Sequence, residues 1–92
     1  MDRMDTIFRA ISDPTRREIL DFLTKDEKPV AELAKSFDIS LPAVSQHLKV
    51  LQKANLVTTR RKGRQIIYQL NATPLRQVSR WIQAYERYWK RI

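Results

Sequence analysis

The chain of 92 residues contains no cysteine, one glycine and one histidine. Without cysteine there is no disulfide scaffold, no Cys-ligated zinc or iron–sulfur site and no thiol catalysis. The single glycine argues against a many-turned β architecture, whose tight turns need residues that accept positive φ. The length corresponds to one domain, and we expect residues 1–92 to form it.

Long apolar runs are also absent, and no stretch approaches the roughly 18–20 apolar residues that a membrane-spanning helix needs. Residues 1–14 (MDRMDTIFRAISDP) carry charges throughout and lack the apolar core of a secretory signal. We therefore expect no membrane segment and a cytoplasmic location.

The residues needed for common enzyme chemistry are scarce. There is a single histidine, no Gly-rich phosphate-binding loop and no carboxylate pair in an obvious pocket. General acid–base catalysis and phosphate-loop chemistry depend on such groups. We assign no catalytic residue and expect neither an enzyme nor a cofactor.

Carboxylates almost disappear from the second half of the chain. Residues 39–92 hold 11 basic side chains and one acidic one, Glu86, whereas residues 1–38 hold 7 basic and 9 acidic ones. The whole chain has a net charge of +8. This uneven distribution is typical of a protein that presents one face to a polyanion.

Four helices are predicted in the first part of the chain, over about residues 5–11, 14–24, 30–37 and 41–53. Asp13 and Ser40 are placed to cap the second and fourth of them, and each is followed by a proline within the first turn. Lys25–Lys28 is expected to be a solvated connection between the second and third helices.

The fourth of these helices has one apolar and one polar side. Val44, Leu48 and Leu51 recur at helical spacing and must face the core. The opposite side is polar or basic and carries no carboxylate, which suits a DNA groove. The residues expected to contact DNA from it are Leu41, Pro42, Ser45, Gln46 and Lys49.

Each of these side chains has an expected role. Gln46 suits a base edge because glutamine can bond N6 and N7 of adenine together, and Ser45 can reach a base or a phosphate. Leu41 and Pro42 are candidates for thymine methyl groups, and Lys49 is placed for a phosphate.

A β-hairpin is predicted over about residues 56–70, because two β-rich runs flank a short segment with the chain's glycine, Gly63. Four of the five residues at its tip are basic. They are expected to bind phosphates, with one of them entering the minor groove, and they are Arg60, Arg61, Lys62 and Arg64.

A last helix is predicted from Pro74 to about Arg91, with apolar side chains three and four residues apart. The stripe is wider than a small domain covers alone, which favours a homodimer interface with help from the first helix. The predicted interface residues are Ile7, Phe8, Leu75, Val78, Trp81, Ile82, Tyr85 and Trp89. The alternative is that the helix packs on its own domain.

Four helices, a hairpin and a long helix follow one another in the order of a winged helix-turn-helix. The predicted fold class is therefore mostly α with a small β-hairpin, in which the hairpin is a wing between the fourth and fifth helices. In such a fold the helices over about residues 30–53 form the recognition unit, whose second helix enters the major groove.

The chain resembles the ArsR (ArsR/SmtB-like) family of bacterial repressors over nearly its whole length. The resemblance rests on residues 8–20 (FRAISDPTRREIL), 30–34 (VAELA), 42–51 (PAVSQHLKVL) and 54–57 (ANLV). It implies a homodimer, built on the terminal helices, that binds an inverted-repeat operator and represses transcription. Its partners would thus be double-stranded DNA and a second copy of the chain.

The resemblance allows His47 to contact DNA as well. The alternative is a partly buried histidine that braces two helices, and both readings stay open. Arg16 and Arg17 also have two readings, since positive charges at a helix N-terminus indicate an outside anion or a carboxylate partner.

Many relatives in this family sense metals, either through a cysteine pair on the third helix or through Asp, His and Glu on the terminal helix. The third helix here has no cysteine, and residues 74–92 contain only Glu86 of those types. One histidine cannot supply the converging ligands that borderline metals need. We expect no metal site and a likeness to the metal-independent members, some of which repress their own genes, and no small-molecule effector is indicated.

A second function class remains open from the sequence. A winged-helix module that binds protein or RNA would have the same order of elements. It would not need a carboxylate-free helix face or four cations at the hairpin tip, and its binding should depend only weakly on salt.

Overall fold

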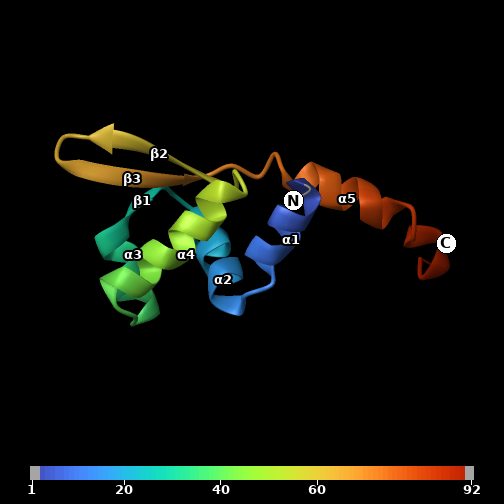
Figure 1. Ribbon diagram of the computed structural model, residues 1–92, viewed down its shortest axis with the longest axis horizontal. Coiled ribbons are helices and arrows are strands. Elements are labelled where there is room, and N and C mark those ends of the chain that lie inside the picture. Colours follow the sequence, from blue (N-terminus) through green and yellow to red (C-terminus); the bar gives the residue numbers. More distant parts are fainter. Residues whose placement is uncertain (1–2, 91–92) are drawn as a thin grey trace.

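The computed structural model describes residues 3–90, and they form a small helical body with a β-wing and a projecting C-terminal arm (Figure 1). The elements in chain order are α1 (Arg3–Ile11), α2 (Pro14–Leu23), β1 (Lys28–Pro29), α3 (Val30–Phe37), α4 (Leu41–Lys53), β2 (Val57–Lys62), β3 (Gln65–Leu70), α5 (Leu75–Gln83) and a 3₁₀ turn η1 (Glu86–Tyr88). This order confirms the predicted fold class, a winged helix-turn-helix with its wing between α4 and α5.

The helix boundaries follow from local capping chemistry. The carboxylate of Asp13 accepts a hydrogen bond from the backbone N–H of Arg16 at 3.0 Å and begins α2. Ser40 Oγ accepts from the backbone N–H of Ala43 at 3.2 Å and begins α4. Asp38 ends α3 in the left-handed conformation with φ of 53°, which aspartate tolerates better than most residues.

The sheet has three antiparallel strands in the order β1-β3-β2. In β1, Lys28 lies opposite Tyr68 and Pro29 opposite Ile67. The prediction that Lys28 belongs to a solvated connection was wrong. A strand of two residues has no alternating pattern to read, and Pro29 fits there because β1 is an edge strand.

Strand β2 of the wing is longer than expected, whereas β3 has the predicted bounds. Gly63, with φ of 61°, makes the turn together with Arg64, whereas Arg60, Arg61 and Lys62 all belong to β2. Because side chains alternate along a strand, Arg60 and Lys62 project from one side of the hairpin and Arg61 from the other. The four cations are therefore spread over both sides of the wing.

The core is centred on α4, whose Val44, Leu48 and Leu51 are fully buried as predicted. Two residues predicted at the dimer interface also lie in this core, namely Ile7, which is 0% exposed, and Val78, which is 9% exposed. Their apolar surface is used within the protomer, and their part in a dimer interface stays a prediction. Helical spacing shows which side of a helix is apolar, but not whether that side meets its own domain or a partner.

The C-terminal arm consists of α5 and η1. We predicted one helix to about Arg91, a residue outside the described range, but α5 ends at Gln83 and a turn and η1 follow. The 3₁₀ pattern begins with the Tyr85 N–H, which donates to the Ile82 carbonyl at 2.8 Å. Aromatic residues favour helix weakly, and a helix without a surface to pack on gains little stability.

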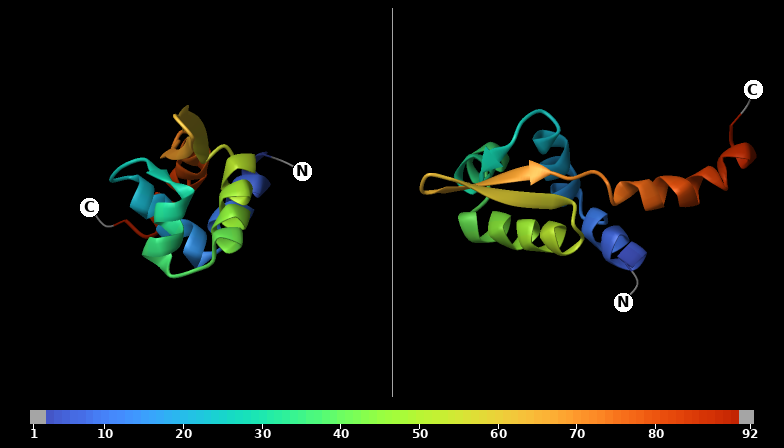
Figure 2. Two further views of the ribbon diagram at one scale, coloured as in Figure 1. Left: turned by 90° about the vertical axis from the view of Figure 1, so that its left-hand side faces the viewer. Right: turned by 90° about the horizontal axis from the view of Figure 1, so that it is seen from above.

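The arm also determines the shape of the molecule. The chain measures 50 × 26 × 20 Å with a radius of gyration of 14.9 Å. A compact chain of this length should have a radius near 12 Å. Figures 1 and 2 show the reason, since the arm and the wing extend from opposite ends of the helical body. None of the helices in residues 3–90 is long and apolar enough to span a membrane.

Candidate nucleic-acid interface

The outer face of α4 is exposed and polar. Pro42, Gln46 and Lys49 follow one another at intervals of four and three residues, which places them on one side of the helix. All three are exposed, as is Leu41, and Ser45 is half-buried beside them. The structure thus brings together the five α4 residues predicted to contact DNA, and α4 itself contains no acidic side chain.

Arg60 in the wing is held by an acidic partner. Its guanidinium forms an ion pair with Glu27, which precedes β1. The Gln69 side-chain amide donates to the same carboxylate at 2.6 Å, so Glu27 ties β2 to β3. Much of the charge of Arg60 is therefore neutralised within the protein, and this contact weakens its assignment to DNA.

The other three wing cations are free of such partners. Arg61, Lys62 and Arg64 are exposed, and within residues 3–90 none of them forms an ion pair. They are available to an outside anion, as is the exposed Lys49 of α4. We call the α4 face and these three side chains the basic face.

Arg16 and Arg17 make contacts that the sequence did not reveal. The Arg16 guanidinium donates from Nε to the Ala10 carbonyl at 2.6 Å and from Nη2 to the Arg9 carbonyl at 3.0 Å. Arg17 Nη1 donates to the Ile11 carbonyl at 2.8 Å. Both arginines thus donate to carbonyl groups at the C-terminus of α1, where positive charge is favourable. In the structure the two arginines bind a helix end, and the charge of Arg16 also acts on the carboxylate of Asp13.

His47 lies on α4 but faces the start of α2. Its Nδ1 is 3.4 Å from Arg16 Nη1 and 3.9 Å from Asp13 Oδ2, and its side chain is 23% exposed. The geometry matches the reading in which this histidine braces two helices.

The surroundings of Asp13 hold the pKa of its carboxyl below the ordinary value of 3.8. The main cause is the hydrogen bond from the Arg16 backbone N–H, opposed by partial desolvation and aided by the positive charge of Arg16 and by His47. A carboxyl group whose pKa is lower in the folded than in the unfolded state stabilises the fold at pH values above its unfolded-state pKa. This contribution is lost as the pH falls through the folded-state pKa.

We predict that Asp13→Asn has a pH-dependent effect. Asparagine caps helices about as well as aspartate, so the variant keeps the cap and loses the charge. Wild type should be more stable at neutral pH, and the difference should shrink below about pH 4. Denaturant unfolding at about pH 7 and pH 3 measures it, and an equal difference at both values would contradict the charge contribution.

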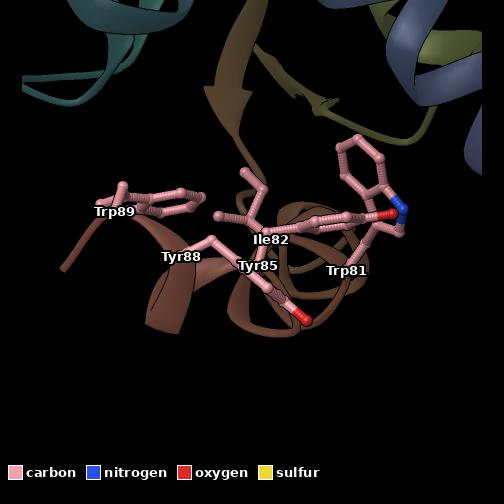
Figure 3. Close-up of a pocket in the computed structure, with 5 residues that line it drawn as sticks. All are labelled: Trp81, Ile82, Tyr85, Tyr88 and Trp89. Carbon is pink, nitrogen blue, oxygen red and sulfur yellow. The ribbon is translucent and has the colours of Figure 1, made fainter.

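The C-terminal arm carries an exposed apolar surface. Trp81, Ile82, Tyr85, Tyr88 and Trp89 line an open groove of about 480 Å³. In Figure 3, Ile82 lies between Trp81 and Trp89. The Trp81 ring packs edge-on against Phe8 of α1 at a centroid distance of 5.5 Å. Leu75 is half-buried at the start of α5.

Within residues 3–90, no three His, Asp or Glu side chains gather where they would hold a metal ion. The acidic residue of the arm, Glu86, forms an ion pair with Lys90 at 3.5 Å. What the surface does offer is the basic face and the apolar arm.

Known proteins are similar to this chain in sequence and in architecture. Residues 11–60 match a family described as a helix-turn-helix domain. The transcriptional repressor SdpR of Bacillus subtilis is 43% identical over 79 residues, which cover 86% of this chain and 88% of that protein.

Solved structures agree with this result. The crystal structure of an ArsR family transcriptional regulator has a TM-score of 0.85 at 31% identity and covers 99% of this chain and 100% of its own. The homodimeric winged helix-turn-helix DNA-binding domain of a possible ArsR-family regulator from Mycobacterium bovis has a TM-score of 0.76 at 26% identity, covering 95% and 82%. These matched proteins are named as transcriptional regulators. The chain belongs to the ArsR family of winged helix-turn-helix transcriptional regulators.

Proposed function

We propose that this regulator is a homodimeric, sequence-specific DNA-binding repressor that acts on an inverted-repeat operator. The observation that carries the proposal is the basic face. It combines an exposed side of α4 that has no carboxylate with three wing cations that form no ion pair in the described residues. The similarity to SdpR, named a transcriptional repressor, and to a homodimeric DNA-binding domain supports it.

In this proposal α4 enters the major groove. Gln46 and Ser45 bond base edges, Leu41 and Pro42 contact thymine methyl groups, and Lys49 binds a phosphate. The exposure of the α4 face supports these roles.

The wing contributes the backbone contacts. Arg61, Lys62 and Arg64 bind phosphates beside the major groove, whereas Arg60 serves mainly as the partner of Glu27. Phosphate contacts of this kind position the protein on the duplex, and base contacts supply its sequence preference.

The dimer forms through the arm. Its apolar surface includes Trp81, Ile82, Tyr85 and Trp89, with Phe8 and Leu75 at its edge. Two α4 helices of such a dimer lie about 34 Å apart on one side of the duplex, which sets the spacing of the half-sites.

We also propose that repression does not depend on a metal. The chain has no cysteine, and α5 has no acidic or histidine side chain. Addition of zinc or arsenite to the protein–operator complex should leave the affinity unchanged. A reproducible release of DNA by either one would identify a metal-responsive repressor.

The experiment that tests the function is fluorescence anisotropy on DNA from upstream of the protein's own gene, against shuffled DNA, across a salt series. We expect binding tighter by about 10³-fold or more on the native DNA, with a steep negative salt slope. Such a result would also favour autoregulation. Absence of binding at low salt would favour the alternative, a winged-helix module for protein or RNA.

The wing assignment gives a prediction with a built-in control. Arg61→Ala and Arg64→Ala should each weaken binding to operator and random DNA alike and lower the salt slope by about one, because each removes one phosphate contact. Arg60→Ala should lower the slope less, since Arg60 is paired with Glu27. Equal slopes in wild type, Arg61→Ala and Arg64→Ala would show that the wing does not contact DNA.

A further inference from the structure

The histidine of the recognition helix is bound from inside the protein. Gln46, its neighbour on α4, is exposed, whereas the ring of His47 lies against the corner between α1 and α2. Its Nδ1 is within hydrogen-bonding distance of Arg16 Nη1, at 3.4 Å. This contact joins residues that are 31 positions apart in the sequence.

The chemistry of the contact determines the state of the ring. A guanidinium has hydrogen-bond donors and no acceptor, so a hydrogen bond between Arg16 and His47 requires Nδ1 to be the acceptor, against the pull of the Asp13 carboxylate, whose Oδ2 lies 3.9 Å from the same nitrogen. The neutral ring then carries its proton on Nε2. Arg16 therefore selects one of the two tautomers of His47, and a protonated ring would lose this hydrogen bond.

Arg16 is itself fixed by α1. Its Nε and Nη2 donate to the carbonyls of Ala10 and Arg9, which leaves Nη1 for His47. Phe8 comes directly before these two residues and packs on Trp81 of the arm. A continuous series of contacts thus runs from the arm through α1 and Arg16 to the recognition helix.

We propose that Arg16 and His47 are positioning residues for DNA binding, which touch neither base nor phosphate and hold α4 at a fixed angle to α1. Because α1 packs on the arm, the same link sets the angle between the two recognition helices of a dimer. This proposal rests on the proposed function. Recognition needs such support, since contacting groups must be held within about 0.5 Å of their productive geometry.

Four variants test the link on DNA. Arg16→Lys keeps the charge and loses the planar three-way contact, and His47→Ala removes the acceptor. Each should bind the operator about five- to ten-fold more weakly with an unchanged salt slope, because no phosphate contact is lost. The double variant should be no weaker than either single variant. His47→Gln, whose side-chain oxygen can accept from Nη1, should stay within about two-fold of wild type.

Arg17→Lys is the matched control. Arg17 is also anchored on α1, through the Ile11 carbonyl, but no contact joins it to α4 in the described structure. Its replacement should leave operator affinity within about two-fold of wild type. Sedimentation and thermal unfolding of every variant confirm that the dimer and the fold are intact.

A second measurement needs no DNA. The sequence has one histidine, so the ¹⁵N spectrum of the imidazole contains one set of signals. At mildly alkaline pH, where an imidazole is neutral, wild type should show the Nε2–H tautomer, and Arg16→Lys should increase the Nδ1–H form.

Three results would overturn the proposal. They are an Nδ1–H tautomer in wild type, a salt slope lowered by about one in His47→Ala, and additive losses in the double variant. The last two would make His47 a direct DNA contact. If wild type itself does not prefer the operator, the proposed function fails and the positioning role fails with it, while the tautomer still reports whether Arg16 binds His47.

Discussion

Ile82→Glu is expected to convert the protein to monomers and to weaken operator binding by about 10²- to 10⁴-fold. A dimer binds its second half-site as an intramolecular step, and this gain is lost when the protomers separate. Ile82 is suited to the test because it is 37% exposed in the protomer and lies in the middle of the apolar groove. A carboxylate there costs little in the monomer and would be buried without a partner in a dimer.

The shape of the molecule gives an independent reason to expect this effect. The arm extends away from the body and carries most of the large exposed apolar side chains, including Trp89, which is 58% exposed. Monomeric proteins rarely leave so much contiguous apolar surface in water. A second arm would cover it.

Sedimentation equilibrium and anisotropy on the operator are the two measurements. Gln83→Glu is the control, because it introduces the same charge at an exposed position of α5. Gln83 lies on the side of the helix away from Leu75, Val78 and Ile82, as the helical period requires. A dimer of Ile82→Glu would show that the interface lies elsewhere. A monomer with unchanged operator affinity would separate dimerisation from DNA binding.

Local signals were sufficient to predict the helical body. Asp13-Pro14 and Ser40 with Pro42 each combine a capping side chain with a proline that fits the first turn, and both start a helix where expected. The recognition face followed from the spacing of Val44, Leu48 and Leu51, because the buried side of a helix defines the exposed one.

Contacts between distant residues could not be predicted in this way. The pairing of Arg60 with Glu27 joins residues 33 apart, and the link between Arg16 and His47 joins residues 31 apart. A cation in a basic cluster has the same sequence signature whether it is free or paired. The burial of Ile7 could not be predicted either, because its position in the apolar stripe of α1 is compatible with a place in the core or at an interface.

These contacts divide the charges of the protein between two tasks. Arg16, Arg17 and Arg60 bind groups within the fold, whereas Lys49 on α4 and the other wing cations are exposed and form no ion pair in the described residues. Net charge overstates the number of phosphates the protein can bind, because paired arginines release no counterions from DNA. The measured salt slope should therefore follow Lys49, Arg61, Lys62 and Arg64 more closely than the total of basic residues.

Gln46→Ala is expected to weaken operator binding by about 1–3 kcal/mol and to relax the sequence preference at one position of each half-site. The reason is that a glutamine bonded to a base edge supplies discrimination that no phosphate contact can replace. Gln46 is exposed and stands between Pro42 and Lys49 on the outer face of α4. Its removal leaves the core residues of the helix untouched.

Binding to a set of operators with single base changes, beside random DNA, measures both effects. Gln52→Ala is the control, since Gln52 is also an exposed glutamine of α4 but lies near the C-terminal end of the helix, turned by about 120° from Gln46. Equal weakening of Gln46→Ala on operator and random DNA would make Gln46 a backbone contact. Specificity would then have to come from Ser45 or from the shape of the DNA, because no other polar side chain of the predicted base-reading set remains.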